Sequence, residues 1–166
     1  MAIYRSVQMT FWTDTKIEDD FTPEDKYFYL YLFTNPHTNL AGCYEISLKL
    51  IAYETGYSKD TIERLLERFK DVHKVIDYCS ETKEVLLINW YKYNWTKSEK
   101  FRKPLKKEIE NIKNNSFREY LTKFVLKRAK YVSVRDEASY NLLKSWNIKA
   151  GLFDDPVWNI DVCKQP

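Results

Sequence analysis

Apolar positions in the first third of the chain predict helices with a repeat of three to four residues and one short extended run. A helix begins after Thr22, because threonine is a favoured N-cap, Pro23 suits the first helical position and the acids that follow face the positive end of the helix dipole. It ends at Asn35, since the residue before a proline is pushed out of the helical region. Residues 43–46 (CYEI) then predict a short strand.

Two more helices follow, separated by a tight turn. Ser47 caps a helix of about two turns that closes at Gly56. Ser58 caps the next one, whose apolar residues fall at i, i+3, i+4 and i+7: Ile62, Leu65, Leu66 and Phe69. Residues 74–79 and 84–90 are rich in β-forming side chains, and the four residues between them predict a hairpin. This succession is the element order of a winged helix-turn-helix.

The second half of the chain begins with apolar residues at helical spacing and then changes to a pattern of strand, helix and strand. From about Phe101 apolar residues recur at helical spacing, and the tendency continues after Asn114 and Asn115, so the sequence leaves open one broken helix or two. Residues 131–134 predict a strand, Asp136 caps a helix, and a second strand ends at Pro156. One βαβ unit belongs to an α/β sheet and cannot bury both of its faces alone.

The predicted fold class is therefore α+β and mainly helical, with a winged helix-turn-helix followed by a helix and a small βαβ appendage. We expect a winged-helix DNA-binding domain over residues 1–100 and a basic helical extension over residues 101–126. Residues 127–166 form the βαβ-like segment, as a natural fusion or as an incomplete domain.

Charge is distributed unevenly along the 166 residues, although the net charge is only +3. Residues 58–130 hold 19 Lys and Arg against 11 Asp and Glu, whereas residues 1–57 hold 4 against 8. A basic middle segment is expected where a nucleic-acid backbone lies. No segment approaches the roughly 18 consecutive apolar residues of a membrane span, and the N-terminus lacks a signal-peptide pattern, so the sequence predicts a cytoplasmic protein.

Candidate catalytic or metal chemistry is scarce. Cys43, Cys79 and Cys163 are far apart and in no CxxC pair, which favours apolar fillers over a zinc site. The two histidines are not at ligand spacing, and adjacent Asp154 and Asp155 would point to opposite faces of a strand. We expect no catalytic residue, no metal, no cofactor and no enzymatic activity.

The helix after Ser58 is the candidate recognition helix, because it follows the tight turn. The candidate residues for base readout are Tyr57, Lys59, Thr61 and Arg64. The candidate contacts to the DNA backbone are Lys74, Lys83, Lys92, Lys97, Lys100, Arg102, Lys103, Lys106 and Lys107. The alternative for the recognition helix is an ordinary solvated face, since Glu63 and Glu67 repel phosphate.

Aromatic residues are interleaved with the lysines of residues 89–103. Trp90, Trp95 and Phe101 are expected to pack between the hairpin and the helices. For Tyr91 and Tyr93 the sequence leaves two roles open, namely packing within the domain and stacking on bases.

Residues 4–121 carry a specific set of motifs: FWTD, DFTPEDKYFYLYLFTNPHTN, GCYEIS, the GY before Ser58, ERF, NWYKYNW and KEIENIK. These residues resemble the N-terminal domain of phage replisome organizers, relatives of the DnaD-type replication initiators. The resemblance implies a winged helix that binds origin double-stranded DNA in a bacterial host cell. It also implies a partner in the host replicative helicase or helicase loader. The sequence leaves the oligomeric state open, with a homo-oligomer as one alternative. A scaffold with little DNA affinity is an alternative.

The tail resembles a different family, polysaccharide pyruvyl transferase, over residues 127–160. The resemblance rests on Ala129 before the strand, on the RDexS helix start and on the later DPvw, which here comprise Arg135, Asp136, Ser139 and residues 155–158. It implies a fragment of an enzyme that transfers pyruvate from phosphoenolpyruvate to a sugar polymer. None of that family's catalytic residues can be placed in this stretch, and no membrane partner is expected.

Overall fold

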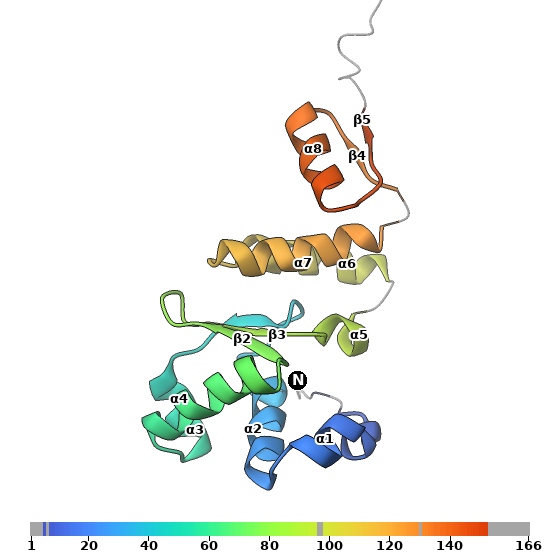
Figure 1. The fold of residues 1–166 in the computed structure, drawn as a ribbon. Helices are drawn as coiled ribbons and strands as arrows, with labels where there is room; N and C mark the ends of the chain where they lie inside the picture. The colour runs from blue at the N-terminus through green and yellow to red at the C-terminus, as the bar shows by residue number, and fades with distance from the viewer. Residues whose placement is uncertain (1–4, 6, 96–97, 130, 153–166) are drawn as a thin grey trace, which may run out of the picture. The chain divides into compact units, whose positions relative to one another are not determined.

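Helices and short strands alternate along the part of the chain that the computed structural model describes, namely residues 5, 7–95, 98–129 and 131–152 (Figure 1). The chain divides into two units, residues 1–118 and residues 119–166. The first unit contains η1 (Met9–Thr13), α1 (Thr15–Asp20), α2 (Pro23–Thr34), β1 (Cys43–Glu45), α3 (Leu48–Thr55), α4 (Lys59–Glu67), η2 (Arg68–Val72), β2 (Ile76–Cys79), β3 (Glu84–Leu87), α5 (Trp90–Asn94) and α6 (Glu99–Glu110). Helix α7 (Asn115–Lys127) crosses the boundary, and β4 (Ser133–Val134), α8 (Glu137–Ser145) and β5 (Gly151–Leu152) follow. The prediction of an α+β, mainly helical fold is confirmed.

The helix boundaries follow the capping residues. At the start of α2 the Thr22 hydroxyl accepts a hydrogen bond from Asp25 N (3.1 Å), and the Asp25 carboxylate accepts one from Thr22 N (3.0 Å). This reciprocal pair satisfies two backbone donors that the helix leaves free. Ser47 accepts from Leu50 N at the start of α3, and Gly56 ends that helix with a φ of 78°. The predicted caps are therefore confirmed.

The first unit is built around a three-stranded antiparallel sheet in the order β1-β3-β2. Val85 and Leu87 of β3 point into the core formed with the helices α2 to α4. Leu86 lies between them in sequence, pairs with Cys43 of β1 and is buried on the other face. Figure 1 shows α2 to α4 on one side of this sheet and α6 on the other. The central strand is therefore covered on both faces.

The hairpin strands are shorter than the sequence predicts. Strand β2 starts at Ile76, because Lys74 has a left-handed backbone with a φ of 54°. Strand β3 ends at Leu87, because Asn89 (φ 66°) turns the chain into α5. Trp90 thus begins a helix and does not end a strand, but it is buried and donates from Nε1 to the Leu40 carbonyl (3.0 Å).

The sequence leaves open one broken helix or two after residue 101, and the structure has two, α6 and α7, with a break after Glu110. The short helices η1 and α1 were not predicted at all. Their five and six residues are too few to show a helical period in the sequence.

A buried ion pair fixes the start of α2 against the end of α4. Asp25 is 1% exposed, and its Oδ1 lies 2.8 Å from Nη2 of Arg68, in the π-helical turn η2 that continues α4. His73 Nε2 lies 3.6 Å from Asp25 Oδ2. The His73 ring is enclosed by Phe21 and Phe69, with ring centroids 4.2 and 5.1 Å away. Because an unpaired buried charge costs several kcal/mol, this cluster holds α4 in one orientation.

Glycine is required at one turn for space and at another only for backbone conformation. A Cβ on Gly42 would lie 2.3 Å from the Trp90 ring, and its φ is 73°. A Cβ on Gly56, with a φ of 78°, would meet nothing within 4 Å. We predict that Gly56→Ala lowers the free energy of unfolding by about 1 kcal/mol and Gly42→Ala by about 3 kcal/mol or more, because overpacking adds to backbone strain. Urea denaturation measures both, and equal losses would contradict this packing.

Burial lowers the pKa of His73, and the charges of Arg68 and Lys16 lower it further against the opposite effect of Asp25. The unfolded chain therefore binds a proton near pH 6.5 that the folded chain does not, so the free energy of unfolding falls as the pH drops through that value. We predict that His73→Gln abolishes the loss of stability between pH 8 and pH 5.5. Urea midpoints at the two pH values measure it.

The matched control is His37→Gln, at the chain's other histidine, which is partly exposed and pairs with Glu54 at 2.8 Å. This variant should keep the loss of stability. If His73→Gln showed the same pH dependence as the wild type, the buried histidine would not be its source.

Candidate nucleic-acid interface

The start of α4 is held by its own cap. The Ser58 hydroxyl accepts from Thr61 N (3.2 Å), and the two hydroxyls lie 2.9 Å apart. Tyr57 precedes the cap and is half-buried, with its ring edge-on to Tyr27 at 5.9 Å, and burial raises its pKa. Tyr57 and Thr61, both predicted for base readout, therefore have packing and capping roles that fix this end of the helix.

Lys59 and Arg64 are the exposed cations of α4 among the predicted readout residues. Lys59 pairs with Glu63 at 3.5 Å one turn along the helix. Arg64 donates from Nε to the carbonyl of Asp60 (3.4 Å), which leaves its terminal nitrogens directed at solvent from an exposed position. The guanidinium of Arg64 is thus the group on α4 best suited to bidentate recognition.

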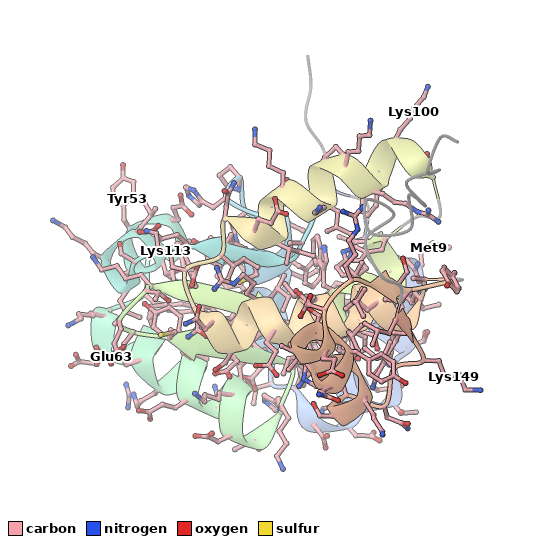
Figure 2. All side chains as sticks on the ribbon, turned by 90° about the horizontal axis from the view of Figure 1, so that it is seen from above. Met9, Tyr53, Glu63, Lys100, Lys113 and Lys149 are labelled. Carbon is pink, nitrogen blue, oxygen red and sulfur yellow. The ribbon has the colours of Figure 1, made fainter. Side chains whose placement is uncertain are left out.

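The electrostatics of α4 do not favour phosphate. Over Lys59–Glu67 the helix carries three carboxylates against two cations. Glu63 stands at the edge of the molecule in Figure 2, well separated from Lys100 of α6. Helix α4 by itself offers no basic surface.

The turn between β2 and β3 carries Lys83, which is exposed and left-handed with a φ of 56°. Its carbonyl accepts from Ile46 N (2.7 Å), so the turn is tied to the residue that follows β1. Only its side chain is free to reach a ligand. The backbone of the turn is therefore held in place, and the Lys83 side chain is the cation that it presents.

Helix α6 presents the strongest run of positive charge. Leu105 and Ile109 are buried, and the predicted basic residues of this helix are exposed: Lys100, Arg102, Lys103, Lys106 and Lys107. Lys100, Lys103 and Lys107 share one face at i, i+3 and i+7. Within the described residues these three lysines enter no ion pair, whereas Lys106 pairs with Glu110 at 3.7 Å. Figure 2 shows Lys100 extending from the helix into solvent.

Polar contacts hold α6 on the sheet. Glu108 accepts from Ala41 N (3.0 Å), just before β1. After the helix, Lys113 N and Asn114 N both donate at 2.8 Å to the carboxylate of Glu84, which is buried in β3. Because α6 covers the face opposite α4, the structure does not bring Arg64 and the α6 lysines onto one surface.

Three predicted backbone contacts lie elsewhere. Lys74 and Lys92 line a cavity beside the N-terminal helices, together with Arg5 and Lys16. Sequence reasoning missed this cavity, because the helices that form its wall gave no periodic signal. Lys97 lies outside the described residues.

No candidate metal cluster is found in the described part of the chain. It contains no group of three His, Cys, Asp or Glu side chains placed to hold a metal ion. Burial raises the pKa of the Cys43 thiol, whereas a hydrogen bond to Thr82 lowers that of Cys79. None of the described helices combines the length and apolarity needed to cross a membrane. Cys163, Asp154 and Asp155 lie outside the described residues.

The second unit contains the predicted βαβ connection. Strands β4 and β5 pair in parallel, with α8 between them. Asp136 caps α8 by accepting from Ser139 N (2.7 Å), and this backbone hydrogen bond lowers the pKa of Asp136. The residues of the RDexS resemblance therefore build a helix start, with Arg135 exposed beside it. Residues 155–158 lie outside the described part.

A comparison with family models matches residues 109–164 to polysaccharide pyruvyl transferase. No curated protein and no solved structure matches the chain. The match supports the resemblance of the tail, and the comparisons give no support for the replisome-organizer resemblance of residues 4–121. Because the matched family is an enzyme family, the prediction that this chain is not an enzyme is wrong. About a third of the chain is similar to polysaccharide pyruvyl transferases.

Proposed function

We propose that residues 1–100 form a winged-helix DNA-binding domain of the replisome-organizer type, with residues 101–126 as its basic extension. The observation that carries the proposal is the order α2-β1-α3-α4-β2-β3 with sheet order β1-β3-β2. In this arrangement a tight turn at Gly56 presents the start of α4, and Ser80 of the hairpin turn lines a shallow pocket with Glu63 and Glu67 of the same helix. A helix presented in this way suits the major groove of duplex DNA.

The two kinds of DNA contact are assigned to separate surfaces. Arg64 on α4 supplies base readout, because its guanidinium is exposed and free of carboxylate partners among the described residues. Lys100, Lys103 and Lys107 on α6 supply phosphate contacts, because their charge is not neutralised by ion pairs within the described residues. Lys83 adds a phosphate contact from the hairpin turn.

The cellular setting that goes with this function is the cytoplasm of a bacterial host cell. Origin DNA is the first partner, and a replicative helicase or its loader is the second. The proposed assembly is a homo-oligomer. It can hold two DNA segments, one on the α4 surface and one on the α6 surface.

Lys100→Glu combined with Lys103→Glu is predicted to weaken duplex binding about tenfold or more for every sequence. It should also reduce the slope of log K against log salt by about 2, since two phosphate contacts are lost. Arg64→Ala should instead lower discrimination between sequences by about 1–3 kcal/mol and leave the slope unchanged. Fluorescence anisotropy at several salt concentrations measures both effects.

The charge-matched control is Lys144→Glu combined with Lys149→Glu, two exposed lysines of the second unit, which should leave duplex binding unchanged. Absence of binding at low salt, or binding that does not depend on salt, would refute the proposal. Capture of helicase without any DNA affinity would replace it with a scaffold role.

The family match favours a second candidate for residues 109–164, a part in pyruvyl transfer to a polysaccharide. Its support is the match together with the parallel β4-α8-β5 unit, which is the kind of element found in α/β enzymes. In this unit Asp136 caps the start of α8 and so orders the loop after β4.

Under this candidate, the chain transfers pyruvate from phosphoenolpyruvate to a sugar polymer. Asp136→Ala should lower the rate, because α8 loses its cap, whereas Asp136→Asn should keep it, since asparagine caps equally well. Polymer-bound pyruvate and released phosphate are the measured products. No product above the level of a protein-free control would exclude transfer by this chain.

A further inference from the structure

A cavity of about 560 Å³ lies between the N-terminal helices and the corner where β3 leads into α5. Its apolar lining comes from both segments: Phe11, Phe21 and Phe33 from the N-terminal part, and Leu87, Trp90 and Tyr93 from β3 to α5. The volume lies within the range of sites that bind ligands or anchor side chains. Neither the proposed DNA contacts of α4 and α6 nor the family match involves this cavity.

Two large apolar side chains that line the cavity are exposed, and two more on the neighbouring helix η1 lie outside its lining. Val7 and Tyr93 line it, and Tyr93 is 64% exposed. Met9 and Trp12, on the helix η1 that carries Phe11, are 88% and 57% exposed. Figure 2 shows Met9 at the outer surface of the molecule. Contiguous exposed apolar side chains beside a cavity mark an interaction surface.

Four cations line the same cavity: Arg5, Lys16, Lys74 and Lys92. Arg5 is positioned by hydrogen bonds to Thr38 Oγ1 (3.1 Å) and Thr38 O (2.7 Å), and it lies 5.5 Å from the centroid of the Trp90 ring. Lys16 donates to the carbonyl of His73. None of these cations pairs with a carboxylate in the described part of the chain.

Asp14 is the carboxylate that lines the cavity, and its side chain caps the helix α1. Asp14 accepts from Lys16 N (3.1 Å) and Ile17 N (3.4 Å) as the N-cap of α1. It therefore compensates the helix dipole, and four cations against one acid leave the lining positive. An apolar cavity with a positive rim is complementary to an apolar ligand with a negative rim.

We propose that this cavity binds an acidic amphipathic helix of a partner protein. The apolar face of that helix, with anchors at i, i+3, i+4 and i+7, fills the space between Phe11 and Trp90. Its carboxylates meet Lys74 and Lys92, and Tyr93 covers the helix from one side. The site is independent of the proposed DNA-binding function, because it uses neither α4 nor α6.

Two other occupants fit less well. A second copy in a two-fold dimer would place the same four cations against one another, which is unfavourable. Single-stranded nucleic acid needs several exposed aromatic faces for stacking, but Phe11 and Phe21 are buried, which leaves Tyr93 as the exposed aromatic side chain of the described lining.

A display library tests the proposal with the full chain as bait. Each member is a helix with leucine, phenylalanine or tryptophan at four positions of one face and a random choice of glutamate, glutamine or lysine on the other. The wild type should enrich glutamate. Lys74→Glu combined with Lys92→Glu should enrich lysine instead, and it should bind the wild-type selection about tenfold more weakly or worse.

Matched variants separate this site from the others. Tyr93→Ala should weaken a selected peptide about tenfold, whereas Tyr53→Ala, at an exposed tyrosine of α3, should not. Lys100→Glu combined with Lys103→Glu should leave peptide binding intact.

Three outcomes would overturn the proposal. One is a selection without preference between glutamate and lysine. Another is binding of a labelled thymidine oligonucleotide that Tyr93→Ala abolishes, which would assign the cavity to single-stranded nucleic acid. The third is a dimer, seen in analytical ultracentrifugation, that Tyr93→Ala dissociates.

Discussion

Burial of the central strand β3 on both faces is the constraint on which the rest of the first unit depends. Val85 and Leu87 pack against the helix core, and Leu86 packs on the opposite face. Glu84 is also buried, which is costly for a carboxylate unless it is hydrogen-bonded. It accepts from the backbone at Lys113 and Asn114, so this polar contact and the apolar face of α6 together close the second side of the sheet.

The covered sheet separates the functional surfaces. The start of α4 lies on one side with a balanced set of charges, and α6 lies on the other with a stripe of lysines. The cavity beside η1 and α1 forms a third surface, with exposed apolar side chains and a positive lining. The three surfaces therefore do not share residues.

The second unit differs from the first in how its apolar side chains are buried. A parallel βαβ connection with two-residue strands exposes much of its apolar surface, including Leu142 and Leu152, while Leu143 and Ile148 are buried. The family match begins at residue 109, inside α6, and so before the boundary at residue 118. The enzyme prediction failed because it rested on the lack of histidine and metal motifs, whereas the family match rests on a pattern spread over many residues.

Local patterns were enough to place the caps and the order of the elements from Thr22 to the hairpin, because capping, proline and periodicity act over a few neighbouring residues. The basic character of α6 and the βαβ order of the tail could also be read from the chain. Long-range packing, in contrast, sets Arg64 and the α6 lysines on opposite sides of a sheet and brings Lys74 and Lys92 to the same cavity as Arg5. These placements depend on contacts between residues far apart in the chain, such as Glu84 with Lys113, which no local pattern encodes.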